Sequence, residues 1–309
     1  MKINELLNIK YPFIQGGMAN ISTGEFAAAV SNAGGLGLIG SGGMTAEKLR
    51  ENIKIAKELT DKPFGVNLML MNPQIDEMAK VVVDEEIRII TTGAGNPAKY
   101  LEMWKLMGAK VFPVVASVAL ARRMEKYGVA GVIAEGTESG GHVGKMTTLT
   151  LVPQIVDAVE IPVIAAGGIG DGRQAAAAFA LGASGVQIGT AMLATVECPI
   201  HENYKKAIVK SKDNDTVVTG LTTGAPVRVI RNKMAKEYIK LENKSVELEE
   251  LEKLTLGSLR KAVFDGDIKM GSLMAGQVCG QIKEILKVED FFDKMFNDMH
   301  RTAHTLCNL

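Results

Sequence analysis

The sequence predicts an α/β protein, a closed (β/α)8 TIM barrel with a small helical subdomain inserted after the eighth strand. As far as about residue 195, short β-branched apolar runs alternate strictly with amphipathic stretches. Such alternation is typical of parallel strands joined by helices that cover the outside of the sheet. Eight units of this length fit a closed barrel better than an open doubly wound sheet.

Each predicted strand ends in a glycine-rich or polar turn, and a helical stretch follows that turn. The strands are expected at residues 12–15, 35–39, 64–68, 87–91, 110–115, 129–134, 162–166 and 185–188. The helices are expected at residues 23–33, 46–59, 74–85, 98–107, 120–127, 150–159 and 172–181. Several of these helices are preceded by Ser, Thr or Asp, the residues preferred as N-caps.

The alternation stops after the eighth strand. Residues 197–266 contain charge-rich stretches and no clear βα repeat, which indicates an inserted helical cap. The barrel domain would then consist of residues 1–196 and 267–309. We expect a helix at 272–286 to close the barrel and a C-terminal helix at 288–309 to pack against its outside.

Composition limits the possible functions. The basic and acidic residues both total 35, so the chain has no overall basic field for nucleic acid or an anionic membrane. The three cysteines are scattered, cannot all pair and lack metal-ligand spacing, which favours a reducing compartment and predicts no metal site. Because the sequence shows neither a signal peptide nor a stretch able to span a bilayer, we expect a cytoplasmic protein.

Two adjacent strand ends have the features of a phosphate site. Residues 165–171 (AAGGIGD) end the seventh strand, and residues 187–190 (QIGT) end the eighth. Glycine lets backbone N–H groups approach an anion, and a helix that begins near Asp171 would add a positive dipole end. Either loop alone is more simply a tight corner, but the pair at this place in a barrel favours phosphate binding.

Residues 135–144 (EGTESGGHVG) follow the sixth strand and carry the candidate catalytic residue, His142. A histidine among bare glycines has little packing role, and a neutral imidazole can give or take a proton near pH 7. The other histidines lie in charged or helical contexts, where a surface role is the simpler interpretation. No nucleophile-elbow sequence accompanies His142, so hydrolysis is disfavoured.

The remaining strand ends are rich in glycine and small residues, as in residues 15–20 (QGGMAN) and 91–96 (TTGAGN). Such a barrel mouth could admit a large flat ring, with Asn67, Gln187 and backbone amides at its edge. It suits a flavin. Met18 and Met274 are the methionines best placed to line this pocket, although scattered methionines are more often core residues.

At this point the motifs resemble a known family over nearly the whole chain. The segments that carry the resemblance are 11–19 (YPFIQGGMA), 33–37 (AGGLG), 62–67 (KPFGVN), 91–97 (TTGAGNP), 113–121 (PVVASVALA), the His142 loop, 165–169 (AAGGI) and 274–277 (MAGQ). They are similar to the group that contains nitronate monooxygenases and enoyl-acyl carrier protein reductases II. Residues 91–97 and 133–136 (IAEG) look most like the reductase.

This resemblance implies an FMN-dependent barrel that takes electrons from NADH or NADPH and reduces the 2,3 double bond of an enoyl chain on acyl carrier protein, usually as a homodimer. It implies His142 as the catalytic residue facing the substrate. The implied cofactor-binding residues are Gly17, Met18, Ala19, Asn67, Glu135, Gly140, Gly167, Gly168, Ile169, Gln187, Gly189, Thr190, Met274 and Gln277. A carrier protein could meet Arg122, Arg123, Arg228, Arg231 or Lys233, although for each of these a solvated surface role is the better interpretation.

Two other readings stay open. A nitronate monooxygenase shares the barrel, the flavin and a histidine in the same loop, but it uses oxygen. A flavin-free phosphosugar isomerase or lyase, or a noncatalytic phosphometabolite binder, would need only the phosphate loops. The segment 219–228 (TGLTTGAPVR) is the part least securely matched to the family, so nicotinamide preference and acyl-length range are left undecided.

Overall fold

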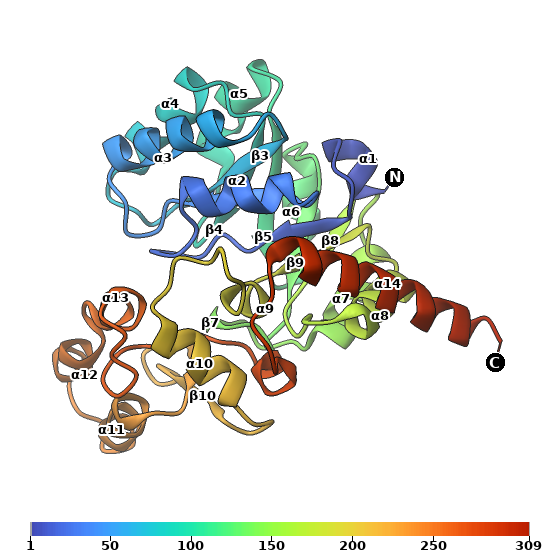
Figure 1. The fold of residues 1–309 in the computed structure, drawn as a ribbon. Helices are drawn as coiled ribbons and strands as arrows, with labels where there is room; N and C mark the ends of the chain where they lie inside the picture. The colour runs from blue at the N-terminus through green and yellow to red at the C-terminus, as the bar shows by residue number, and fades with distance from the viewer. Residues whose placement is uncertain (1, 309) are drawn as a thin grey trace.

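A computed structural model describes residues 2–308 of the 309-residue chain. Eight parallel strands form one sheet in the order β1-β9-β8-β6-β5-β4-β3-β2 (Figure 1). These strands are β1 (Phe13–Gln15), β2 (Gly37–Gly40), β3 (Phe64–Met69), β4 (Ile89–Gly93), β5 (Lys110–Val115), β6 (Val132–Glu135), β8 (Val163–Ala166) and β9 (Gly185–Ile188). The ring closes beside β1, where Ile14 bridges Leu36 and the Leu36 N–H donates to the Phe13 carbonyl at 2.9 Å. The predicted barrel is confirmed.

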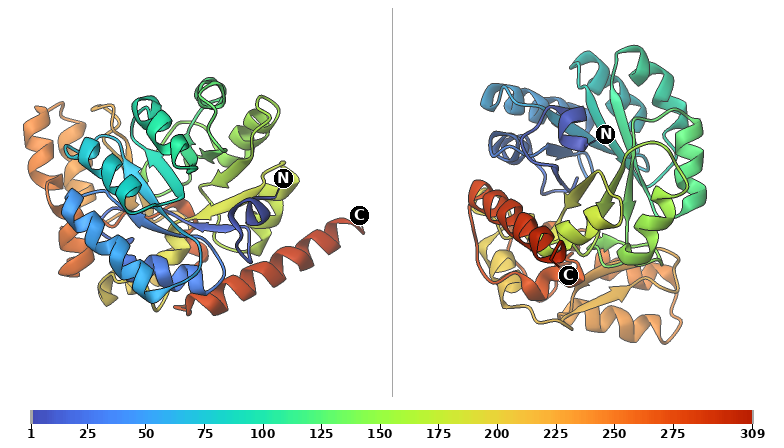
Figure 2. Two further views of the ribbon diagram at one scale, coloured as in Figure 1. Left: turned by 90° about the horizontal axis from the view of Figure 1, so that it is seen from above. Right: turned by 90° about the vertical axis from the view of Figure 1, so that its right-hand side faces the viewer.

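Helices cover the outside of the barrel (Figures 1 and 2). They are α2 (Gly24–Asn32), α3 (Ala46–Leu59), α4 (Ile75–Asp84), α5 (Ala98–Leu106), α6 (Val118–Lys126), α7 (Thr148–Val156) and α8 (Gly172–Ala180). The side chains of Thr23, Thr45, Ser117 and Asp171 accept hydrogen bonds from first-turn N–H groups of four of these helices. Such caps satisfy donors that have no partner inside the helix.

The eighth outer helix is α14 (Val288–Leu306), which packs along α8 and also contacts α2 (Figure 2). Its buried Phe292 lies against Phe13 of β1 and so anchors the helix to the barrel. The predicted closing helix at 272–286 is wrong, because this segment is extended and contains only a short 3-10 helix, η1 (Gln277–Gln281). A Cβ at Gly276 would lie 2.5 Å from the Glu138 carbonyl oxygen, so close packing shapes this stretch. The end of the other predicted helix, residue 309, lies outside the described residues.

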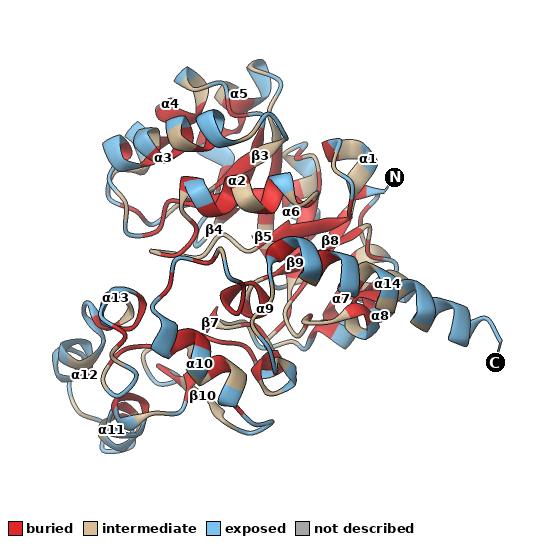
Figure 3. Ribbon diagram, in the orientation of Figure 1, coloured by how far each residue is buried: buried red, intermediate tan, exposed pale blue. Residues whose placement is uncertain are grey.

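A cluster of apolar side chains fills the interior of the barrel toward the amino-terminal ends of its strands. Ile14, Leu38, Phe112 and Ile164 form a cluster there with the short helix α1 (Ile3–Leu7). A second, larger core lies between the sheet and the outer helices, and Figure 3 shows the strands as almost continuously buried. These side chains fill the lower part of the barrel, and a cavity is left at the carboxyl ends of the strands.

The inserted segment contains the expected helices and also two strands that the sequence pattern did not predict. Its elements are α10 (Glu202–Lys210), β10 (Thr216–Thr219), β11 (Val227–Ile230), α11 (Lys233–Glu242), α12 (Leu248–Thr255) and α13 (Ser258–Phe264). β11 pairs on one edge with β10 and on the other with β7 (Gly141–His142), which belongs to the loop after β6. The insert therefore shares a sheet with the loop that carries His142.

Within residues 2–308, no helix is both long enough and apolar enough to cross a bilayer. In the same range no three His, Cys, Asp or Glu side chains come together in a way that could hold a metal ion.

Candidate active site

A cavity of about 270 Å³ opens at the carboxyl ends of the barrel strands. This volume is near the lower end of the roughly 300–1,000 Å³ range of small-molecule sites. The cavity is lined by His142, Gly17, Met18, Ala19, Asn67, Glu135, Gly140, Gly167, Gly168, Ile169, Gln187, Gly189, Thr190 and Met274. Gln277 is the one predicted site residue that the structure leaves out: it is exposed at the start of η1 and does not line the cavity.

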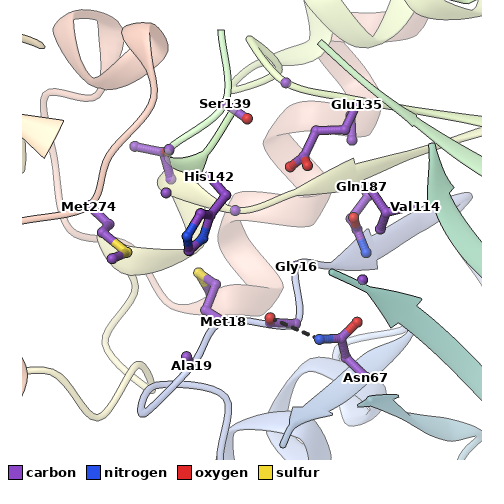
Figure 4. A pocket seen from close by; sticks show the side chains of 18 of the residues that line it. Gly16, Met18, Ala19, Asn67, Val114, Glu135, Ser139, His142, Gln187 and Met274 are labelled. Carbon is purple, nitrogen blue, oxygen red and sulfur yellow. Dashed lines mark hydrogen bonds between the residues drawn. The ribbon is translucent and has the colours of Figure 1, made fainter. Parts of the chain in front are cut away.

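The loop after β1 and the strand β3 meet closely at one wall of the cavity. A Cβ on Gly17 would lie 2.2 Å from Cβ of Asn67, so only glycine allows this approach. The Asn67 amide is held from two sides, since its Nδ2 donates to the Gly17 carbonyl at 3.3 Å and its Oδ1 accepts from the Thr91 hydroxyl at 2.8 Å. The position of the Asn67 side chain is thereby fixed before any ligand binds (Figure 4).

The two glycine loops after β8 and β9 present unused hydrogen-bond donors. Gly167 and Gly168 have φ values of +92° and +70°, in the region that favours glycine. Among residues 2–308, the N–H groups of Gly168, Ile169, Gly189 and Thr190 have no acceptor. A Cβ added to Gly189 would meet only Met18 Sδ, 4.0 Å away. Backbone donors beside open space are the arrangement that binds phosphate.

The first turn of α8 offers this site fewer free donors than the sequence suggested. The Asp171 carboxylate accepts from the N–H groups of Arg173 and Gln174, and the Gln174 side chain accepts from the Asp171 N–H. This capping box satisfies the first turn of the helix with its own side chains. Asp171 also lies outside the cavity. The donors available to an anion are therefore those of the loops, which fit the phosphate end of FMN without help from the helix.

His142 lies at the rim of the cavity on β7. Its side chain is exposed and makes no hydrogen bond to residues 2–308. Figure 4 shows the imidazole close to the side chains of Met18 and Met274. An unpaired imidazole in this position is free to exchange a proton with a bound molecule.

Glu135 ends β6 inside the cavity, and its environment changes its acidity. Burial raises the pKa of Glu135 from 4.5 to about 7. The carboxyl lies deep in the protein, and the residue is half-buried because it faces the cavity. The Ser139 hydroxyl lies nearby without a hydrogen bond of ordinary geometry, and it has no other partner among residues 2–308. Both groups can therefore bind a ligand.

The sequence reasoning missed several lining residues. Ser139 could have been found, because it precedes His142 by three positions in the same loop. Leu259 of α13 could not, since the sequence places the insert after the eighth strand but does not say which of its side chains reach the cavity. Of the basic residues considered for a carrier protein, Arg228 is buried and not on the surface.

The family model of nitronate monooxygenases matches residues 1–298. A probable nitronate monooxygenase of Staphylococcus saprophyticus is 34% identical over 89% of this chain and 91% of its own length. Among solved structures, FabK of Thermotoga maritima is 48% identical, with a TM-score of 0.97 over 99% of this chain and 98% of that one. A nitroalkane oxidase of Streptomyces ansochromogenes is 27% identical, with a TM-score of 0.87 over 98% and 99%. The chain belongs to the nitronate monooxygenase family, and it is an oxidoreductase of the FMN-dependent type.

Proposed function

We propose that this member of the nitronate monooxygenase family binds FMN in the barrel mouth and uses NADH or NADPH to reduce trans-2-enoyl chains carried by acyl carrier protein. The product would be the saturated acyl chain, as in the last reductive step of fatty-acid elongation. The likeness to FabK over almost the full length of both chains is the observation that carries this proposal. The resemblance of residues 91–97 and 133–136 to the reductase supports it from the sequence.

The donors of the two glycine loops would hold the FMN phosphate, and the wall formed by Gly17, Met18 and Asn67 would hold the ring. When bound, FMN supplies the chemistry that accepts hydride from a nicotinamide and delivers it to the alkene. The Thr190 hydroxyl accepts from the Gly276 N–H at 2.8 Å, which leaves its own proton free for a ligand. Glu135, neutral over much of the range below pH 7, can donate a hydrogen bond to a polar ring edge.

His142 acts on the substrate in this proposal. Its free ring nitrogen would donate a hydrogen bond to the thioester oxygen, where negative charge develops as hydride reaches the β-carbon. It would then supply the proton for the α-carbon, directly or through water. Met18 and Met274 lie next to the imidazole (Figure 4) and line the same cavity, so they give the bound substrate an apolar surface beside the proton donor.

The decisive test measures NADH and NADPH oxidation by the FMN-loaded protein with crotonyl thioester. Oxidation that depends on the thioester, with butyryl thioester as product, is the expected result. Absence of thioester-dependent oxidation in protein that has bound FMN would contradict the proposal.

Nitronate oxidation is the second candidate, because the matching family model and the similar staphylococcal proteins carry that name. It would use the same cavity and His142 but would consume oxygen instead of a nicotinamide. Oxygen uptake with a nitroalkane or its nitronate, without an effect of enoyl thioester on NADH oxidation, would favour this activity over the reductase.

The proposal extends to the assembly and location of the protein. A homodimer in the cytoplasm, meeting an acidic carrier protein through basic surface residues such as Arg123 and Lys233, is consistent with the balanced charge and the scattered cysteines. Sedimentation of the FMN-loaded protein with and without acyl carrier protein tests both associations.

A further inference from the structure

The central strand β11 of the three-stranded sheet carries two parts of the cavity wall side by side. Val227 pairs with His142 and Arg228 with Gly141, in an antiparallel register. Two residues further along, Val229 bridges Met274. The main chain of one four-residue strand therefore sets the distance between the imidazole and the thioether that flanks it (Figure 4).

The Arg228 side chain adds a second attachment to the same loop. Its Nε and Nη2 donate to the Thr137 carbonyl at 3.2 and 3.1 Å, and its Nη1 donates to the Thr216 hydroxyl at 3.4 Å. Thr137 lies at the base of the loop, where its N–H donates to the Met146 carbonyl at 2.7 Å. The loop that carries His142 is thus held at its base by a side chain and near its tip by a backbone pairing, and both come from β11.

Arg228 is also electrostatically unusual. It is only 7% exposed and forms no ion pair with any carboxylate of residues 2–308. Burial lowers the pKa of its guanidinium, and the more distant charge of Glu138 acts in the opposite direction. Burying a cation without a paired anion is costly, so a residue that only filled space here would be more stable if it were apolar. The free-energy cost of this burial indicates a role for the bidentate hydrogen bonding of the guanidinium group, which only arginine supplies.

We propose that Arg228 is a positioning residue for His142. Its two hydrogen bonds to the Thr137 carbonyl, together with the pairing of β11 and β7, fix the direction in which the imidazole points into the cavity. The insert then takes part, together with the barrel, in determining where the proton donor lies. The kinetic part of this inference rests on the proposed function of His142; the structural part does not.

The experiment compares Arg228→Met and Arg228→Lys with a matched control, Arg231→Met. Arg231 is three residues away, exposed, and donates to the Asn214 carbonyl at 3.2 Å. FMN affinity, measured by fluorescence quenching, should stay within about threefold of wild type in all three variants. NADH oxidation with ferricyanide as acceptor, which does not need the proton donor, should also be retained.

With crotonyl thioester, kcat of Arg228→Met should fall by at least about tenfold, because small misplacements of a catalytic group cost one to two orders of magnitude. KM should change little, and Arg228→Lys, which can make one of the two hydrogen bonds, should lie between Arg228→Met and wild type. In a His142→Ala background, Arg228→Met should have almost no further effect, since both changes remove the same contribution. Additive losses, or an unchanged kcat in Arg228→Met, would overturn the proposal.

A direct readout separates this inference from the proposed function. In flavin-free protein, the NMR signals of the His142 ring, assigned by comparison with His142→Ala, should shift or broaden in Arg228→Met and stay unchanged in Arg231→Met. If Arg228→Met does not fold, the same comparison is made with Arg228→Lys. Unchanged His142 signals in a folded Arg228 variant would contradict the positioning role. Changed ring signals together with full activity of His142→Ala would retain the positioning role and remove the proposed role of His142.

Discussion

The Glu138 carboxylate receives three hydrogen bonds from Thr148, two from its N–H at 2.9 and 3.0 Å and one from its hydroxyl at 2.9 Å. The Thr148 hydroxyl also lies 2.9 Å from the Gly167 carbonyl. One buried threonine thereby joins the loop that carries His142, the first turn of α7 and the glycine loop after β8. The proton donor and the anion-binding loop are therefore parts of one connected structure.

Thr148→Val should lower the free energy of unfolding by about 1–3 kcal/mol, because it removes a donor from a carboxylate that has few other partners. Thr150→Val is the matched control, since the Thr150 hydroxyl is exposed and bonds only within the same turn. Urea unfolding of the flavin-free proteins measures both changes. Equal losses in the two variants would show that the contact with Glu138 has no special weight.

His142→Ala should reduce turnover of crotonyl thioester by about 10²–10⁴-fold, the usual contribution of a general acid. Affinity for FMN should be retained, because the exposed ring of His142 makes no hydrogen bond to the part of the chain that the structure describes. His304→Ala, which changes an exposed histidine on α14, should leave turnover unchanged. Near wild-type turnover in FMN-loaded His142→Ala would remove this residue from the mechanism.

Gly189→Ala should weaken FMN binding by about tenfold or more without lowering the Tm of flavin-free protein. The added methyl group meets only Met18 Sδ at 4.0 Å, so it enters the space beside the loop donors and does not clash with the protein. Riboflavin serves as the internal control, since it lacks the phosphate. Quenching titrations should show that the preference for FMN over riboflavin declines, whereas a parallel loss for both ligands would place the phosphate elsewhere.

Glu135 should make the stability of the flavin-free protein depend on pH. Its folded pKa of about 7 lies above the ordinary 4.5, so between these values the folded state holds a proton that the unfolded chain has released. The corresponding stability is present below pH 4.5 and is lost as the pH rises through about 7, up to about 3 kcal/mol in all.

Glu135→Gln should therefore raise Tm relative to wild type at pH 8 and match it near pH 4.5. Glu249→Gln, an exposed change of the same charge, should match wild type at both pH values. Thermal melts at the two pH values give the comparison. A Glu135→Gln protein that is no more stable than wild type at pH 8 would show that the carboxyl is not destabilised when charged.

Local patterns in the sequence predicted the barrel because each strand and each helix has its own pattern of apolar and polar residues. The run that becomes β5 and the helix 46–59 were predicted with their observed bounds. A short apolar run in the first, and 3.6-residue periodicity with an N-cap threonine in the second, lie within a few neighbouring residues. The helix predicted at 272–286 was wrong because local patterns do not decide the conformation of this segment. Its backbone follows contacts with Glu138 and β11, which lie far away in the chain.

The cavity was predictable to the extent that βα topology forces strand ends together. Gly168, Gly189 and His142 could be predicted as site residues because glycines at adjacent strand ends and a histidine among glycines are chemically unusual. Two details could not be predicted in this way. Leu259 reaches the cavity from α13, and Gln277 lies outside the cavity because η1 begins at this residue.

By itself the sequence determined which residues stand at the carboxyl ends of the strands, because the alternating pattern fixes the direction of every strand. Only the tertiary structure decided that the insert shares a sheet with the His142 loop, that Arg228 is buried and that Asp171 caps its own helix. Those outcomes depend on contacts between segments that are distant in the sequence. Such contacts form only when the chain folds, so no local sequence pattern predicts them.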